Sequence, residues 1–287
     1  MTQVTNPTQP ASSLPGGGGG GGSTVIGITG ANRLNGSDNN DIILTFGGAD
    51  VVAGGGGDDL IITGGGNDTV GGGDGNDNIF AGSGADVVAG GSGDDRIFAG
   101  KGDDLVDGGD GNDLVSGDNG NDTVLGGSGS DTVFGGRGND IVSGGDGNDS
   151  LFGGKDNDTV DGGSGNDFIS GDRGADVLTG GAGSDTFYFF SSGGDYGVDT
   201  ITDFTPGEDK IRLKQGGVFA GLGSTFEASE FVVVSNFNAA TPGAATTNKL
   251  VYDPSNGTLY FNSNNGVLTI AQLQPGLTIT SNNFELF

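Results

Sequence analysis

The stretch from Gly36 to Tyr188 divides into consecutive blocks of nine residues: GSDNNDIIL, TFGGADVVA, GGGGDDLII, TGGGNDTVG, GGDGNDNIF, AGSGADVVA, GGSGDDRIF and so on to GGAGSDTFY. There are 17 blocks, without an insertion or a deletion. The sixth position is aspartate in every block, and the eighth is aliphatic in all but the last, where Phe187 stands. The fourth is glycine except at Asn39 and Asp156, residue types that tolerate a positive φ. This register predicts a repeat protein with one structural unit per block.

The composition excludes several kinds of chemistry. The 287 residues include 66 glycines and 38 acidic residues but no histidine and no cysteine, and the net charge is -28. Catalytic triads with histidine, thiolate nucleophiles, disulfides and the usual zinc sites are therefore excluded. An acidic chain does not attract nucleic acid, and no stretch reaches the roughly 18 apolar residues of a membrane span. We expect no catalytic residues, no cofactor-binding residues other than metal ligands, no nucleic-acid partner and no membrane span.

Each block predicts a short strand at positions 7 to 9 and a turn at positions 1 to 6. The eighth side chain points inward and its neighbours point outward, because side chains alternate along a strand. Successive blocks then alternate between two sheets, so aspartates 18 residues apart lie in adjacent turns, as Asp59 does over Asp41. Carboxylates this close repel one another unless a cation lies between them. Calcium prefers six to eight oxygen ligands, which carboxylates and turn carbonyls supply together.

The blocks resemble the GGxGxDxUx nonapeptides of the repeats-in-toxin (hemolysin-type calcium-binding) family of secreted bacterial proteins. The resemblance implies an all-β fold, a right-handed parallel β-roll, in which the sixth-position aspartates and the early turn carbonyls of neighbouring coils hold calcium. The candidate metal ligands are Asp41, Asp50, Asp59, Asp68, Asp77, Asp86, Asp95, Asp104, Asp113, Asp122, Asp131, Asp140, Asp149, Asp158, Asp167, Asp176 and Asp185. The other interpretation, that these aspartates only form solvated turns, does not explain why the sixth position is invariant while the fifth varies.

Calcium and folding are expected to be coupled. Seventeen blocks form fifteen pairs two blocks apart, so about 15 calcium ions would be bound if each pair holds one. Between residues 36 and 188 there are 29 aspartates and 5 basic residues, a net charge of -24 that these ions would more than neutralise. One inward aliphatic side chain per block is a thin core. Metal binding and folding should therefore be one event.

The composition changes at both ends of the array. We expect a flexible, glycine-rich tail over residues 1–24 and a calcium-binding roll over 25–188, whose degenerate coils at 25–35 carry Asn32 and Leu34 in the places of aspartate and aliphatic. Residues 189–287 predict a β-rich cap, and its segment VDTITDFTPGEDKIRLK resembles the one that follows the repeats in many family members. Strands are expected at Phe231–Val234, Lys249–Tyr252 and Thr258–Phe261, the last two flanking the turn DPSNG.

The two edges of the predicted roll differ in charge. The third position of alternate blocks carries a basic ladder, which comprises Lys101, Arg137, Lys155 and Arg173, whereas the other edge is acidic. This ladder either relieves the charge of the nearby turns or forms a docking strip for an anionic partner, such as a surface polysaccharide or a neighbouring roll. The ninth position adds an aromatic stripe on one outer face, which either stabilises the sheet or serves self-association.

The two termini bear on export. The N-terminal stretch MTQVTNPTQPASSLPGGGGGGG lacks the basic start and the apolar core of a secretory signal peptide. The C-terminal NNFELF resembles the uncleaved signal of type I secretion substrates, although it also reads as the last strand of the cap. We therefore expect a secreted, extracellular or cell-surface calcium-binding protein that is exported by type I machinery. Its expected role is structural or interactive rather than enzymatic; the alternative is a non-catalytic relative of a secreted repeats-in-toxin hydrolase or hemolysin.

Overall fold

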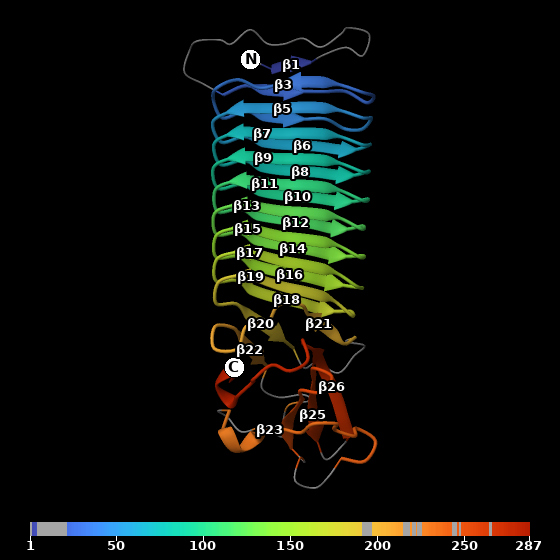
Figure 1. Ribbon diagram of the computed structural model, residues 1–287. Coiled ribbons are helices and arrows are strands. Elements are labelled where there is room, and N and C mark those ends of the chain that lie inside the picture. The colour runs from blue at the N-terminus through green and yellow to red at the C-terminus, as the bar shows by residue number, and fades with distance from the viewer. Residues whose placement is uncertain are drawn as a thin grey trace. The chain divides into compact units, whose positions relative to one another are not determined.

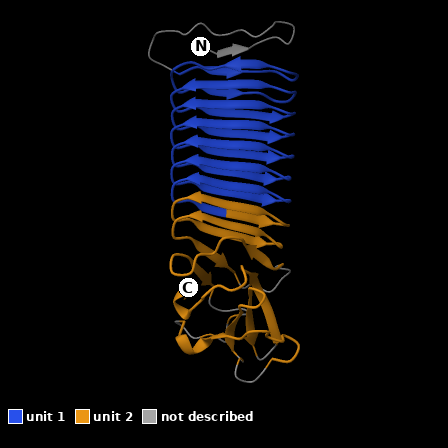
Figure 2. Ribbon diagram, in the orientation of Figure 1, with its two compact units in different colours: residues 1–151 blue, residues 152–287 orange. Residues whose placement is uncertain are grey.

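The structure is a computed structural model that describes residues 2–4, 22–190, 197–214, 219, 222, 226–242, 246, 248–263 and 266–287. The chain divides into two compact units, residues 1–151 and 152–287 (Figure 2). The described part is almost entirely β-structure, apart from turns and short 3-10 helices such as η2 (Ala228–Glu230) and η4 (Ser281–Asn283). None of its helices has the length and hydropathy needed to cross a membrane.

The first unit consists of two parallel sheets whose strands alternate along the chain (Figure 1). One sheet runs in the order β1 (Thr2–Val4), β2 (Thr24–Ile26), β4 (Ile42–Leu44), β6 (Leu60–Gly65), β8 (Asn78–Ser83), β10 (Arg96–Lys101), β12 (Leu114–Asn119) and β14 (Thr132–Arg137). The other contains β3 (Arg33–Asn35), β5 (Val51–Gly56), β7 (Thr69–Asp74), β9 (Val87–Ser92), β11 (Leu105–Asp110), β13 (Thr123–Ser128) and β15 (Ile141–Asp146). Strand β16 (Ser150–Lys155) contains the unit boundary.

The second unit begins with the same alternation and ends in the cap. One of its sheets has the order β18 (Phe168–Arg173), β20 (Thr186–Phe189), β22 (Lys210–Leu213) and β27 (Phe284–Leu286). The other has the order β17 (Thr159–Ser164), β19 (Val177–Ala182), β21 (Asp199–Ile201), β26 (Gly266–Gln272), β25 (Thr258–Ser263), β24 (Lys249–Asp253) and β23 (Phe231–Val233). Parallel pairing therefore continues beyond Tyr188, through β21 and β22.

Within the nine-residue array, neighbouring strands of a sheet pair in parallel with a register of 18 residues, as in Val52↔Val70. The prediction of an all-β parallel roll is thus confirmed. The regular strands span six residues rather than the predicted three, because pairing resumes at the second and third positions of the next block, as in Gly55↔Gly73. Gly73 has a φ of 124°, and a Cβ there would overlap the carbonyl oxygen of Gly55. Only glycine allows two coils to approach this closely.

The eighth-position side chains fill the space between the sheets. From Ile43 to Phe187 they are at most 3% exposed. The preceding coils follow the same rule, since Val25 and Leu34 are equally buried, as predicted for degenerate coils. On the outer face, Phe80 and Phe98 stack with their ring centroids 5.4 Å apart and 8° between their planes. The aromatic stripe therefore does form ring contacts between adjacent strands, as sheet stabilisation requires.

The N-terminal segment differs in part from the predicted tail. Residues Thr2–Val4 form β1, which pairs in parallel with β2. A strand at this position covers the edge of one sheet, which would otherwise expose unpaired backbone groups. The remainder of the predicted tail up to residue 21 lies outside the described residues.

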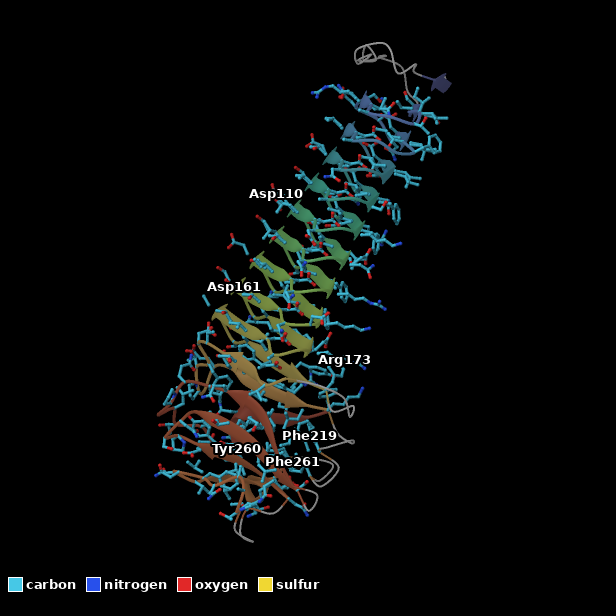
Figure 3. All side chains as sticks on the ribbon, turned by 90° about the vertical axis from the view of Figure 1, so that its right-hand side faces the viewer. Asp110, Asp161, Arg173, Phe219, Tyr260 and Phe261 are labelled. Carbon is cyan, nitrogen blue, oxygen red and sulfur yellow. The ribbon has the colours of Figure 1, made fainter. Side chains whose placement is uncertain are left out.

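The cap contains the three predicted strands, with small shifts in their ends. β24 and β25 form an antiparallel hairpin, with Leu250 opposite Phe261, around the predicted DPSNG turn. Tyr252 and Phe261 are almost fully buried, and Phe219 meets Phe261 edge to face at 5.5 Å (Figure 3). Large aromatic side chains bury more apolar surface than the single aliphatic side chain of each block in the roll, so they stabilise the cap more strongly.

Candidate calcium sites

The seventeen sixth-position aspartates lie inside the turns and are at most 4% exposed. They form two rows, one along each edge. The odd row consists of Asp41, Asp59, Asp77, Asp95, Asp113, Asp131, Asp149, Asp167 and Asp185. The even row consists of Asp50, Asp68, Asp86, Asp104, Asp122, Asp140, Asp158 and Asp176. Acidic side chains are almost never this buried without a partner.

In most of these carboxylates, one oxygen is held by the backbone of the adjacent coil. The amide of an aspartate donates to Oδ1 of the aspartate 18 residues later, for example from Asp59 to Asp77 at 2.7 Å and from Asp122 to Asp140 at 2.8 Å. The same bond joins Asp158 to Asp176 at 2.8 Å and Asp167 to Asp185 at 3.0 Å in the second unit. These bonds bring adjacent carboxylates of a row into the register that the sequence predicted.

The second oxygen is left without a hydrogen bond along much of both rows. Oδ2 is buried and accepts no hydrogen bond in Asp50, Asp59, Asp68, Asp77, Asp86, Asp95, Asp104, Asp113, Asp122, Asp131 and Asp176. A buried, unsatisfied carboxylate oxygen is strongly unfavourable. A cation that ligates these oxygens would remove the penalty.

The raised pKa values of the buried aspartates also indicate that the rows need a compensating cation. Burial, assisted by the neighbouring carboxylates, raises the pKa of Asp59, Asp95 and Asp122 to about 7, and the pKa of Asp104 and Asp131 to about 6. The ionised rows therefore lack compensating positive charge when no metal is bound.

The donor set suits calcium. The described residues contain no group of three or more Asp, Glu, His or Cys placed to hold a metal ion. A cation in one of these turns would therefore rely on a few carboxylate oxygens and on backbone carbonyls, the hard ligands that calcium accepts in flexible geometry. At Gly54, a Cβ would overlap both Asp59 Oδ2 and the carbonyl oxygen of Gly72. The glycine thus lets a carboxylate and a carbonyl converge in the turn.

The first turns of the even row depart from this pattern. The first position is occupied by Thr45, Thr63, Ala81 and Ala99, all of them buried. The Thr63 hydroxyl donates to the carbonyl of Ala81 at 2.7 Å, so this carbonyl already has a protein partner. Farther along the row, Asp118 and Asp172 occupy the second position with φ of 70° and 65°. These residues make the even turns less uniform than the odd ones.

The odd row ends in carboxylates that the protein itself satisfies. Oδ2 of Asp41 accepts hydrogen bonds from the amide of Ser37 at 2.6 Å and from its hydroxyl at 2.9 Å, while Oδ1 accepts the amide of Ser23. In the cap, Asp209 accepts the amides of Asp185 at 3.0 Å and Thr205 at 2.7 Å. Of the predicted ligands, Asp41 is thus the one whose hydrogen bonding leaves least need for an ion.

Two residues that the sequence reasoning missed extend the rows into the cap. Asp199 accepts the amide of Asp176 at 3.1 Å, and Asp209 takes the corresponding place after Asp185. Burial raises the pKa of Asp199 to about 8 and that of Asp176 to about 6. The signal was present, because DTI and DKI repeat the spacing of aspartate and aliphatic found in the blocks.

The fifth position also carries a ladder that the sequence reasoning missed. The amide of Asn76 donates to Asp58 Oδ1 at 2.9 Å, and the amide of Asp94 donates to Asn76 Oδ1 at 2.8 Å. This ladder is exposed and runs opposite to that of the sixth position. Twelve of the 17 blocks have Asn or Asp there, which was the available signal.

Comparison with protein families agrees with this geometry. The model of the RTX calcium-binding nonapeptide repeat matches residues 26–61, 44–79, 80–115, 89–124, 116–151, 125–160 and 161–189. The chain belongs to the RTX calcium-binding nonapeptide repeat family. The predicted membership is therefore confirmed, and the residues matched span the roll.

Comparison with curated proteins finds no match. Among solved structures, the chain is similar to the AlgE6R3 subunit of the Azotobacter vinelandii mannuronan C5-epimerase, with 24% identity, coverage of 60% of this chain and 77% of that one, and a TM-score of 0.29. It is also similar to the extracellular lipase LipA of Serratia marcescens, with 17% identity, coverage of 86% and 40%, and a TM-score of 0.21.

Without calcium, the RTX roll should be more stable in mild acid than at neutral pH. The folded-state pKa values near 6 to 7 lie above the ordinary 3.8. The stability that protonation contributes is therefore complete below about pH 4 and is lost as pH rises through about 6 to 7. The strand signal in circular dichroism, recorded in chelator across this range, should fall as pH rises. A signal independent of pH would contradict the electrostatic account.

The two rows should respond unequally to loss of one carboxylate. Asp113→Ala removes the partner of Asp95 and Asp131 in regular odd turns, whereas Asp122→Ala removes that of Asp104 and Asp140 among less regular even turns. We expect Asp113→Ala to raise the calcium midpoint for folding further than Asp122→Ala does. The midpoint is measured by circular dichroism, and a shift for Asp122→Ala that equals or exceeds the other would show that the rows are equivalent.

Proposed function

We propose that the chain is a secreted repeat protein that folds on meeting extracellular calcium, with the sixth-position aspartates as metal ligands. The observation that carries this proposal is the set of eleven buried Oδ2 atoms that accept no hydrogen bond, arranged in two rows of stacked turns. Family membership supports calcium as the ion. Calcium bound between successive turns would satisfy these oxygens and neutralise the repulsion within each row.

We propose a structural or cell-surface interaction role rather than an enzymatic one. The family model that matches describes calcium-binding repeats. In the described part of the roll, the buried acidic side chains are stacked uniformly from coil to coil, as expected for structural metal sites. Metal sites repeated in this way would hold successive coils together and would not form a single active site.

The proposal predicts that chelation unfolds the roll. In a calcium titration, circular dichroism should change from a largely disordered spectrum to a strand spectrum at millimolar calcium or below, because extracellular calcium modules bind at roughly 10⁻⁴ to 10⁻³ M. Magnesium at equal concentration is the matched control, since it demands a stricter octahedral site. If the strand spectrum persists unchanged in chelator, calcium is not required for folding and the proposal fails.

Export by type I machinery is a further part of the proposal, and the C-terminus is its candidate signal. In the folded protein this segment forms β27, in which Phe284 is 5% exposed and Glu285 pairs with Arg212 at 3.6 Å. Arg212 also lies over the Phe287 ring at 5.2 Å. A receptor could therefore read the segment only before the cap folds.

Deletion of Phe284–Phe287 should trap the protein in the producing cell. Arg212→Ala is the control, because it removes the contacts of β27 in the folded cap while leaving the C-terminal sequence intact. The measurement is the ratio of secreted to cellular protein. We expect a large fall in this ratio for the deletion and little change for Arg212→Ala. Normal export of the deletion variant would assign the segment to the cap alone.

A further inference from the structure

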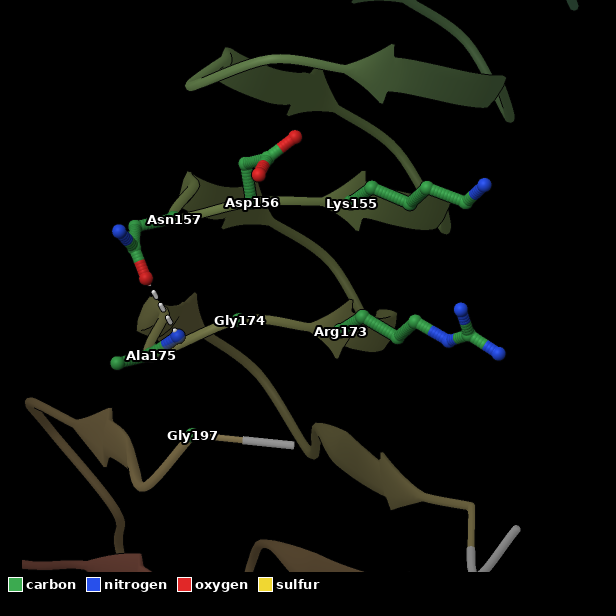
Figure 4. A pocket seen from close by; sticks show the side chains of 7 residues that line it. All are labelled: Lys155, Asp156, Asn157, Arg173, Gly174, Ala175 and Gly197. Atoms are coloured by element: carbon green, nitrogen blue, oxygen red, sulfur yellow. Dashed lines mark hydrogen bonds between the residues drawn. The ribbon is translucent and has the colours of Figure 1, made fainter. Parts of the chain in front are cut away.

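Two cationic side chains lie side by side in adjacent turns of the second unit. Lys155 ends β16 and Arg173 ends β18, 18 residues later and in the neighbouring strand. Both are exposed, and Arg173 projects away from the strands (Figure 3). They line a cavity of about 630 Å³ together with Asp156, Asn157, Gly174, Ala175 and Gly197 (Figure 4).

Neither cation is paired within the described part of the chain, where the ion pair found is that of Arg212 with Glu285. Asp156 is adjacent in sequence, but its carboxylate lies apart from both cationic groups (Figure 4). The backbone of Asp156 has a φ of 78°, so the turn holds this residue in a left-handed conformation. The sixth-position carboxylates of the same two turns, Asp158 and Asp176, are buried.

Calcium would change the charge around this cavity. Asp158 and Asp176 are joined by the backbone hydrogen bond of the even row, at 2.8 Å. If calcium binds between their turns, as the proposed function requires, the two buried carboxylates are neutralised and no longer compensate the cations in front of them. Lys155 and Arg173 then present positive charge that an external anion can neutralise.

We propose that Lys155 and Arg173 form a calcium-dependent binding site for the carboxylate groups of an acidic polysaccharide. The inference rests on the proposed function, because calcium loading switches the site on. Arg173 offers the planar fork that binds a carboxylate with two hydrogen bonds, and Lys155 adds a point charge in the next turn. Adjacent turns lie about 4.8 Å apart, the spacing of neighbouring strands. This spacing is comparable to the length of one sugar in an extended chain.

The surroundings favour a sugar acid over a nucleic acid. The Asp156 carboxylate can accept hydrogen bonds from sugar hydroxyls at the cavity, but it repels a densely charged phosphate backbone. The open cavity beside the two cations can also hold a sugar ring, with the carboxylate of the sugar at the cations and its hydroxyl groups at Asp156.

The experiment measures binding of a galacturonic acid hexamer to the full chain by calorimetry. Free calcium is fixed with an electrode, because the hexamer itself binds calcium. Cellohexaose is the neutral probe, and hexameric polyphosphate tests a phosphate ligand. The test variant is Lys155→Glu with Arg173→Glu. The matched control is Arg96→Glu with Lys101→Glu, which makes the same charge change on β10 at residues that do not line the cavity.

We expect the hexamer to bind in calcium and not in chelator, with cellohexaose inactive. The test variant should bind about tenfold to hundredfold more weakly, as expected for loss of charge-assisted hydrogen bonds, and the control should stay within about twofold. An equal loss of affinity in both variants would show that binding depends on the net charge of the protein, and it would contradict a site at Lys155 and Arg173. Tighter binding of polyphosphate at the same residues would make the ligand class wrong.

The two proposals fail in different ways. Circular dichroism of each variant in calcium reports folding independently of sugar binding. If the chain folds with calcium but the hexamer does not bind, only the site at Lys155 and Arg173 is rejected. If calcium produces no folding, the proposed function fails first. The double glutamate variants keep all sixth-position aspartates, so their calcium-induced strand spectrum should match that of the unchanged chain.

Discussion

The stacking of buried carboxylates is the constraint on which the rest of the roll depends. Most sixth-position aspartates have one oxygen hydrogen-bonded to a backbone amide of the adjacent coil, and in many turns the other oxygen has no donor. The backbone bond fixes where the carboxylate lies, so the charge cannot move to solvent. The stability of the roll therefore depends on neutralisation of these carboxylates, by protons or by a cation, and not on the apolar core alone.

This constraint explains the unusual composition. Turns that bring carboxylates and carbonyls together need backbone conformations and close approaches that a Cβ would block, as at Gly54 and Gly73. Glycine loses more conformational entropy on folding than any other residue, so the same residues that build the turns destabilise the metal-free roll. One inward aliphatic side chain per nine-residue block does not offset that cost. The cap differs because large aromatic side chains, Tyr252 and Phe261 among them, are buried in its core.

Much of the fold and of the candidate site could be predicted, because a nine-residue period determines both the sheet register and the position of every turn. The length of the strands was underestimated, since glycine in the second position was taken as turn although it pairs with the next coil, as Gly55 does. Asp199 and Asp209 were missed because the period breaks before them: their partners lie 23 and 24 residues away instead of 18. The role of Asn76 was missed because exchange of Asn for Asp at the fifth position resembled random variation, whereas both accept the same backbone hydrogen bond.

The same physics links the interior of a turn to its surface. In the even turns that carry Lys155 and Arg173, the carboxylates of Asp158 and Asp176 are buried. If calcium binds there, as we propose, it neutralises their charge, and the surface of these turns becomes more positive. The odd turns carry acidic or small residues at the matching position, such as Asp110 and Ser128. Under the proposed function, calcium would therefore increase the difference in charge between the two edges of the roll, and an anionic partner would bind the basic edge of the calcium-loaded chain.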